Sequence, residues 1–155
     1  MSRIHYARHD GRRQSGIGMI EVLIAVLVVS IGFLGMAALQ AKALSTNNSA
    51  MARSMATVAS YSILDAMRTD LVSAEGGAYN GTVTANACPD PGTSLSGLQL
   101  NKWCQQLGAT LGATATTTGA INCTILAVCT VTIQFNDARA GDNLNTQTVS
   151  TVTQL

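Results

Sequence analysis

The chain has 155 residues, of which 47% are hydrophobic and only 11% are charged, and its formal net charge is +1 at pH 7. Residues 1–16 hold four of the nine Lys and Arg residues but one of the eight Asp and Glu residues, which leaves residues 17–155 at about −2. Scattered basic residues on a slightly acidic chain argue against nucleic-acid binding. Both histidines, His5 and His9, also lie in residues 1–16, so residues 17–155 have no imidazole to act as a general base or metal ligand. A Gly-rich phosphate loop and a CxxC pair are absent as well, so the common catalytic motifs are missing and no cofactor is expected.

A basic segment joins a long apolar run near the N-terminus. Arg12 and Arg13 precede Gly16, and residues 17–39 (IGMIEVLIAVLVVSIGFLGMAAL) contain a single charged residue, Glu21. Roughly 20 apolar residues suffice for a helix to cross a bilayer, so we expect residues 17–39 to span a membrane. An acidic group costs about 2.5 to 3.5 kcal/mol at the centre of a spanning helix and less near its end. Glu21 therefore indicates either a specific role or a side chain that extends its carboxylate to the membrane edge.

This junction resembles the class III signal of type IV prepilins. In that family a short basic leader ends in Gly, prepilin peptidase cuts after it, and an apolar helix with Glu as its fifth residue follows. The resemblance implies a cut between Gly16 and Ile17, N-methylation of Ile17, and an ion pair between Glu21 and the N-terminal amine of a neighbouring subunit. Two positions depart from the family pattern, because Ile17 stands where Phe is usual and Gly18 where Thr or Ser is common.

The uneven charge also predicts how the chain is oriented. Positive residues remain on the cytoplasmic side of a first apolar helix, which places everything after residue 39 outside the cytoplasm. All four cysteines lie in that outer part, where an oxidising periplasm permits disulfides. With the resemblance, this implies a single-pass protein of the bacterial inner membrane whose C-terminal domain is in the periplasm.

Residues 40–76 are expected to continue the helix outward as its outer half, because no proline occurs before Pro89. Apolar residues recur there at intervals of three and four, which predicts one packing face. This face contains Met51, Met55, Val58, Ala59, Ile63, Ala66 and Met67. Another face is assigned Arg53, Thr57, Ser60 and Arg68. Asp65 and Arg68 are spaced to meet on the helix surface, and Glu75-Gly76-Gly77 marks the expected end of the helix.

Residues 77–155 are predicted to form a small extracytoplasmic globular domain. A stripe of Leu100, Trp103, Cys104, Leu107 and Leu111 predicts a short helix that follows the turn at residues 90–94 and ends near Gly108. Val131, Ile133 and Phe135 alternate with polar residues, which predicts a strand over residues 129–135. Residues 146–155 are expected to pair with it in antiparallel fashion, and residues 115–123 are a candidate third strand.

Four cysteines allow three pairings. We favour Cys88 with Cys104, which ties a loop to the short helix, and Cys123 with Cys129, which closes a short loop before a strand. A domain of about 80 residues buries little surface, and disulfides are a common supplement at that size. The alternative is a zinc site, but the irregular cysteine spacing and the oxidising compartment disfavour one, so no metal is expected.

The resemblance extends to minor pilins of the PilV, or type IV pilus modification, kind. It covers most of residues 12–155 and rests on the run from Glu21 to Gln40, the Asp65–Arg68 segment, the helix around Trp103, and the CTVTIQFND stretch with the final Thr-Gln-Leu. It implies an α+β, type IV pilin-like fold in which a long N-terminal helix packs on a small antiparallel sheet. It also implies a protein without catalytic activity that helps to prime pilus assembly in a tip complex, for pili of the kind used in adhesion and twitching motility.

The implied partners are other minor pilins, the major pilin, the inner-membrane assembly machinery, prepilin peptidase as processing enzyme, and the lipid bilayer before assembly. Two other functions remain open. A type II secretion pseudopilin shares the same N-terminal design. A secreted or membrane-anchored binding protein or enzyme would use the apolar run as an ordinary signal or anchor, with Ala41-Lys42-Ala43 as a cleavage site, although the run exceeds the 7 to 15 residues of a secretory signal.

Overall fold

The computed structural model describes residues 18–137 and 146–155. Its elements, in chain order, are α1 (Met19–Thr69), α2 (Leu71–Glu75), β1 (Gly81–Thr84), α3 (Leu95–Leu111), β2 (Thr118–Cys123), β3 (Val128–Asn136) and β4 (Thr146–Gln154). The chain divides into two compact units, Met1–Gln40 and Ala41–Leu155, and α1 contributes residues to both.

The described part of the first unit is helical from Met19 onward. The helix starts directly after Gly18, whose carbonyl accepts a hydrogen bond of 2.9 Å from the Glu21 N–H. Gly32 and Gly35 lie inside α1 without interrupting it, although each Gly costs nearly 1 kcal/mol relative to Ala in a helix interior. By length and composition α1 can cross a membrane, and its most apolar 18-residue window has a mean hydropathy of 2.8 and no buried residue.

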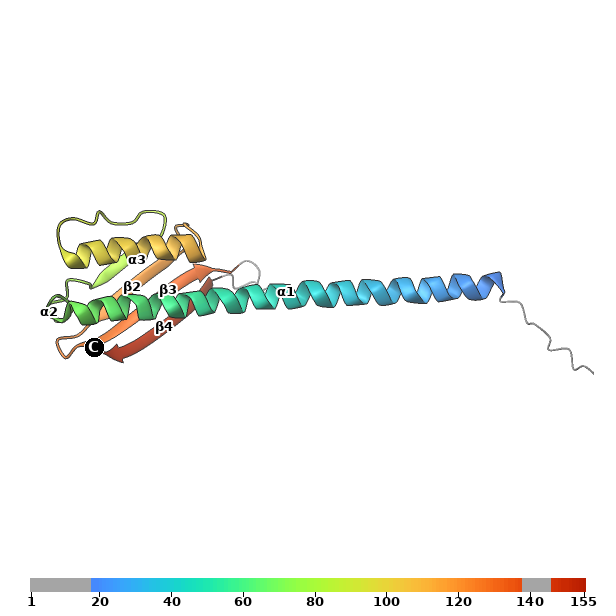
Figure 1. The fold of residues 1–155 in the computed structure, drawn as a ribbon, viewed down its shortest axis with the longest axis horizontal. Coiled ribbons are helices and arrows are strands. Elements are labelled where there is room, and N and C mark those ends of the chain that lie inside the picture. The colour runs from blue at the N-terminus through green and yellow to red at the C-terminus, as the bar shows by residue number, and fades with distance from the viewer. Residues whose placement is uncertain (1–17, 138–145) are drawn as a thin grey trace, which may run out of the picture. The chain divides into compact units, whose positions relative to one another are not determined.

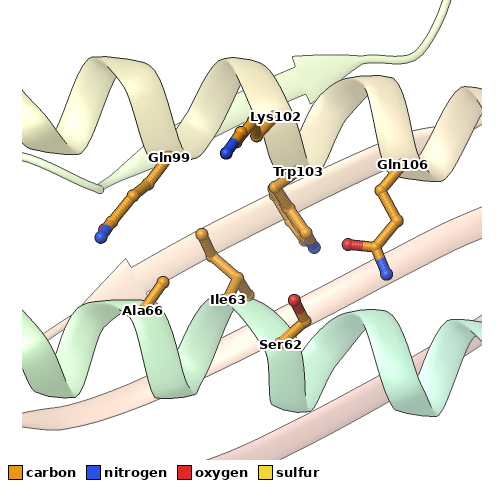
Figure 2. A pocket seen from close by; sticks show the side chains of 7 residues that line it. All are labelled: Ser62, Ile63, Ala66, Gln99, Lys102, Trp103 and Gln106. Atoms are coloured by element: carbon orange, nitrogen blue, oxygen red, sulfur yellow. The ribbon is translucent and has the colours of Figure 1, made fainter.

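The second unit has two layers (Figure 1). One layer is a four-stranded antiparallel sheet in the order β1-β2-β3-β4. The other consists of α3 and the C-terminal part of α1, which lie over the same face of the sheet (Figure 2). The three predicted strands are confirmed as β2, β3 and β4, with β4 antiparallel to β3, whereas the short β1 was not predicted. An α+β arrangement of one long apolar helix and a small antiparallel sheet is therefore present.

The core lies between these layers, and it corrects the predicted packing face of the helix. The buried side chains of α1 are Ala56, Ala59, Ser60, Ile63, Leu64 and Met67. Met51 and Val58, which the periodicity placed on this face, are more than half exposed. Ser60 was assigned to the polar face, but its hydroxyl donates to the Ala56 carbonyl at 3.0 Å and is therefore satisfied inside the core.

Helix α3 begins at an N-cap, where the Ser94 hydroxyl accepts a hydrogen bond from the Gly97 N–H at 3.1 Å. It ends at Leu111, three residues beyond the predicted end at Gly108. Its Trp103 is buried against β2, and the position beneath it must be small, because a Cβ on Gly119 would come within 2.8 Å of the ring and of Leu107. The indole N–H donates to the Ala59 carbonyl at 3.0 Å, which joins α3 directly to α1.

The predicted continuous helix up to residue 75 is wrong at Asp70, where α1 ends and the five-residue α2 begins. Asp70 leaves the helical region with φ −131° and ψ 53°. Its carboxylate accepts hydrogen bonds from the hydroxyls of Ser73, at 2.7 Å, and Tyr79, at 3.0 Å. These side-chain bonds offer the backbone an alternative to the helix. The second helix ends at Glu75, as Gly76 and Gly77 predicted.

Two disulfides fasten the second unit, and they join the pairs that the sequence favoured. Cys88 and Cys104 connect the segment after β1 to α3, with a Cα–Cα distance of 5.6 Å. Cys123 and Cys129 lie opposite each other on β2 and β3, with a Cα–Cα distance of 4.0 Å. The second disulfide therefore crosses the β2–β3 hairpin at its turn end.

Candidate functional site

Glu21 is the candidate site residue that the structure describes in the first unit. It lies in the first turn of α1, where a carboxylate is stabilised by about 0.3 to 1 kcal/mol by the positive end of the helix dipole. Its neighbours Ile20, Val22 and Leu23 are exposed apolar residues, and Glu21 has no ion-pair partner within the described ranges. The arrangement presents one negative charge at the start of an apolar helix surface.

The predicted cleavage position between Gly16 and Ile17, and the predicted methylation of Ile17, lie outside the described residues. So do both histidines. The cleavage and methylation of Ile17 therefore stay predictions.

The apolar surface that follows Glu21 consists of side chains that would be buried in an ordinary globular core. From Met19 to Leu39, every large hydrophobic residue is more than half exposed. At Gly32 and Gly35, an added Cβ would meet nothing within 4 Å beyond the adjacent residues and the helix's own backbone, so the helix surface is open there. Such a surface requires either lipid or the apolar surface of another helix around it.

In the second unit, a groove of about 320 Å³ lies between α1 and α3. Figure 2 shows Gln99, Trp103 and Gln106 extending from α3 towards α1, and Ile63 and Ser62 extending from α1. Lys102 supplies the only charge in this lining. Its ammonium group and the two amides can donate hydrogen bonds to carbonyl or carboxylate groups of a bound chain.

One end of this groove is fixed by a partly buried hydrogen-bond cluster. The Tyr79 hydroxyl is within hydrogen-bonding distance of both Asp70 and Gln99. Burial and the Asp70 carboxylate raise the pKa of Tyr79 well above its usual range, so the phenol stays protonated at alkaline pH values where a free tyrosine ionises. The cluster joins the α1–α2 break to α3 and holds that end of the groove in place.

The sequence reasoning missed an exposed apolar tip on the β2–β3 hairpin. Ile125 and Leu126 are 88% and 73% exposed. They are the central residues of a turn in which the Ala127 N–H donates to the Thr124 carbonyl at 3.0 Å, and Ala127 has a positive φ of 56°. The sequence could have indicated this exposure, because the ring closed by the Cys123–Cys129 disulfide is too short to bury the side chains within it.

In the described ranges, His, Cys, Asp and Glu do not gather in any group of three or more that could hold a metal ion. The four described cysteines are all consumed in disulfides. The single described salt bridge, between Asp65 and Arg68 at 3.8 Å, is at the exposed position that the spacing predicted.

Comparison of the chain with family models, with curated proteins and with solved structures finds no match in any of the three.

Proposed function

We propose that this chain is a minor pilin that takes part in type IV pilus biogenesis, as one member of a tip complex of minor pilins that primes assembly. Its first unit would anchor the protein in the inner membrane and later pack among the helices of other pilins. Its second unit would present contact surfaces to those neighbours from the periplasm.

The observation that carries this proposal is the carboxylate of Glu21 in the first turn of α1, which is the only charge in residues 19–39. In a medium of low dielectric constant an unpaired carboxylate is costly, whereas a carboxylate paired with an amine is far less so. A new N-terminus created after Gly16 would supply such an amine on each neighbouring subunit. The pairing would then fix the axial position of one helix against the next.

The second unit supports the proposal through its construction. Two disulfides suit a small domain in an oxidising compartment, which agrees with the orientation predicted from the basic leader. The long helix packed on a small antiparallel sheet corresponds to the α+β layout that the resemblance to pilins implies.

The decisive variant is Glu21→Ala, with Glu21→Asp as its matched control. We expect Glu21→Ala to be cleaved normally but incorporated into sheared pili at least about tenfold less, because a charge pair is lost, whereas Glu21→Asp retains the charge and part of the incorporation. Immunoblots of membrane and pilus fractions measure both. Normal incorporation of Glu21→Ala would contradict the charge-pair role.

Mass spectrometry of the membrane-bound chain tests the processing. An N-terminus at Ile17, methylated or not, supports a pilin. An N-terminus at Leu44 would indicate a secretory signal that is cut after Ala43. An intact Met1 would indicate an unprocessed anchor. Either result would overturn the proposal.

Deletion of the gene distinguishes the pilus from the type II secretion system, whose pseudopilins share the N-terminal design. Loss of surface pili with protein secretion intact is the expected result. Loss of secretion with pili intact would assign the chain to the secretion system instead.

A further inference from the structure

In the second unit, the side of α1 that faces away from the sheet carries apolar residues at a seven-residue spacing. Leu44, Met51 and Val58 are seven residues apart, and Tyr61 follows three residues after Val58. These four side chains are all more than half exposed. Intervals of three and four residues extend the set to eight exposed positions, which we call the outer seam of α1: Leu44, Asn47, Met51, Ser54, Val58, Tyr61, Asp65 and Arg68.

The outer seam has the spacing of a helix that pairs with another helix. On an ordinary solvated surface, exposed apolar residues are scattered singly. In a two-stranded coiled coil, by contrast, alternating intervals of three and four residues form the contact between the helices. The positions that flank such a contact often carry charges, which select or repel a partner. Here the flanking positions from Ala43 to Ser62 are uncharged, so they would not repel an identical helix: Ala43, Asn48, Ala50, Met55, Thr57 and Ser62.

We propose that the outer seam of α1 binds the outer seam of a second copy of this chain, with the two helices parallel and in register around a two-fold axis that runs along them. Each residue of the seam then lies opposite its own copy. The side chains of Asn47 and Ser54 can each donate and accept hydrogen bonds with their copies, and Val58 packs against Val58. A shift by one heptad would place Val58 against Asp65, so the in-register pairing is favoured.

The charges at the end of the outer seam are complementary to those of a second copy. Asp65 and Arg68 form an exposed ion pair at 3.8 Å within one chain. Positions three residues apart on the seam form adjacent layers of a parallel pair, so each Asp65 also lies near Arg68 of the second copy. These cross-pairs offset the repulsion between the two opposed carboxylates. The other basic residues of α1 in the second unit, Lys42 and Arg53, lie off the seam, and Arg53 hydrogen-bonds Gln147 of β4.

The layers of the second unit leave the outer seam open for this pairing. The buried side chains of α1 lie on the opposite side of the helix, and α3 lies beside α1 in the same layer (Figure 1). A two-fold axis along the seam therefore puts the two sheets on the outside and the two α3 helices on opposite sides of the α1 pair. Because the helices run parallel, both first units extend from the same end of the dimer, as anchoring in one bilayer requires. This pairing does not rest on the proposed pilus function, since any protein anchored by one helix could use it.

Cysteine cross-linking of the full chain in detergent micelles tests this pairing. Helix axes about 9 Å apart, with Cα atoms about 2.3 Å from each axis, bring opposed seam residues to roughly 5 Å, within disulfide range. We expect Asn47→Cys and Tyr61→Cys each to form a disulfide-linked dimer under mild oxidation. Thr46→Cys is the matched control, because Thr46 is exposed but lies about 100° around the helix from Asn47. It should remain monomeric.

The same variants distinguish the parallel pair from other arrangements. In an antiparallel pair Asn47 would lie near Tyr61 of the second copy, so the two variants would cross-link when mixed but not alone. That result would overturn the proposal, as would equal cross-linking by Thr46→Cys. Failure of both seam variants to cross-link would mean that lipid, solvent or a different protein covers the seam, and would overturn it too.

A charge variant provides a second test and keeps the native cysteine set. Val58→Lys places two ammonium groups against each other in the seam, and we expect it to weaken dimerisation about tenfold in sedimentation measurements in micelles. Val152→Lys is the matched control, since Val152 is exposed on β4 and pairs with Thr130 on the face of the sheet opposite the core. It should leave the dimer unchanged. Equal dimerisation by the two variants, which would include dimers held by the first unit alone, would reject the outer seam as the contact.

Discussion

The two units of this chain differ in where their apolar side chains are placed. In the first unit, the large hydrophobic residues from Met19 to Leu39 are exposed along a helical segment whose one carboxylate is Glu21. In the second, Ile63, Trp103 and Phe135 are buried between two helices and a sheet that two disulfides fasten. The second unit therefore has an internal source of stability, whereas the first has an apolar surface that needs lipid or another helix.

This difference separates two kinds of mutational effect. A substitution in the core of the second unit changes its free energy of unfolding, whatever surrounds the protein. A substitution on the apolar surface of the first unit changes the interaction with the surroundings and leaves the second unit's unfolding unaffected. Urea unfolding measured by circular dichroism, together with membrane or pilus partitioning, distinguishes the two.

The largest expected effect on unfolding is that of Trp103→Ala. It removes a buried indole, opens a cavity above Gly119 and leaves the Ala59 carbonyl without its donor, so we expect a loss of about 3 to 5 kcal/mol. Leu34→Ala is the control in the first unit, where the side chain is 72% exposed, and should change the unfolding free energy by less than about 0.5 kcal/mol. Similar losses from both would contradict the contrast between the units.

Removal of the disulfides should give the next largest effects, in a defined order. Cross-linking stabilises by restricting the unfolded chain, and the restriction grows with loop length. We expect a Cys88→Ala/Cys104→Ala protein, with a separation of 16 residues, to lose about 3 kcal/mol. The Cys123→Ala/Cys129→Ala protein, with a separation of 6, should lose about 2 kcal/mol. If urea unfolding showed a larger loss without the Cys123–Cys129 disulfide, strain in the Cys88–Cys104 disulfide would outweigh the effect of chain entropy.

A smaller, pH-dependent effect is expected at Tyr79. Its pKa is raised by burial and by Asp70, so in the folded protein the phenol stays protonated at pH values where the unfolded chain, with a pKa near 10, ionises. Its contribution is complete below pH 10 and is lost above that value, at up to about 1.4 kcal/mol per pH unit. Tyr79→Phe should cost about 1 kcal/mol at pH 7 and reduce the alkaline slope.

Tyr61, which is 57% exposed, provides the control for that experiment. Tyr61→Phe should leave both the stability at pH 7 and the alkaline slope unchanged. An unaltered slope in Tyr79→Phe would show that the buried phenol does not determine the alkaline behaviour.

The sequence predicted those parts of the fold whose pattern is local. The strand β3 was identifiable because Val131, Ile133 and Phe135 alternate with polar residues. The structure buries all three side chains. The four-residue β1 is too short for such a pattern. Ser60 was placed on the wrong face because composition cannot show that its hydroxyl bonds back to Ala56.

At the break, Asp70 accepts a hydrogen bond from Tyr79, nine residues later, and the periodicity of the helix does not reveal that contact. The candidate site residues also differ in whether the sequence alone reveals them. Glu21 was identifiable because one charge in an apolar run is conspicuous in any sequence. The groove beside Trp103 requires the arrangement of α1 and α3, which the sequence pattern left undetermined.

The smallest expected effect on unfolding is that of Glu21→Ala, which tests whether a change in the first unit affects the unfolding of the second. Glu21 belongs to the first unit, so its loss should change the urea midpoint of the second unit by no more than the measurement error. Its interaction with the helix dipole, about 0.3 to 1 kcal/mol, affects the start of α1 alone, because that interaction falls off within the first turn. The same variant is expected to lose incorporation into pili. A protein that unfolds normally but fails to assemble would place the role of Glu21 entirely in contacts between subunits, whereas a shifted midpoint would show that the two units are coupled through α1.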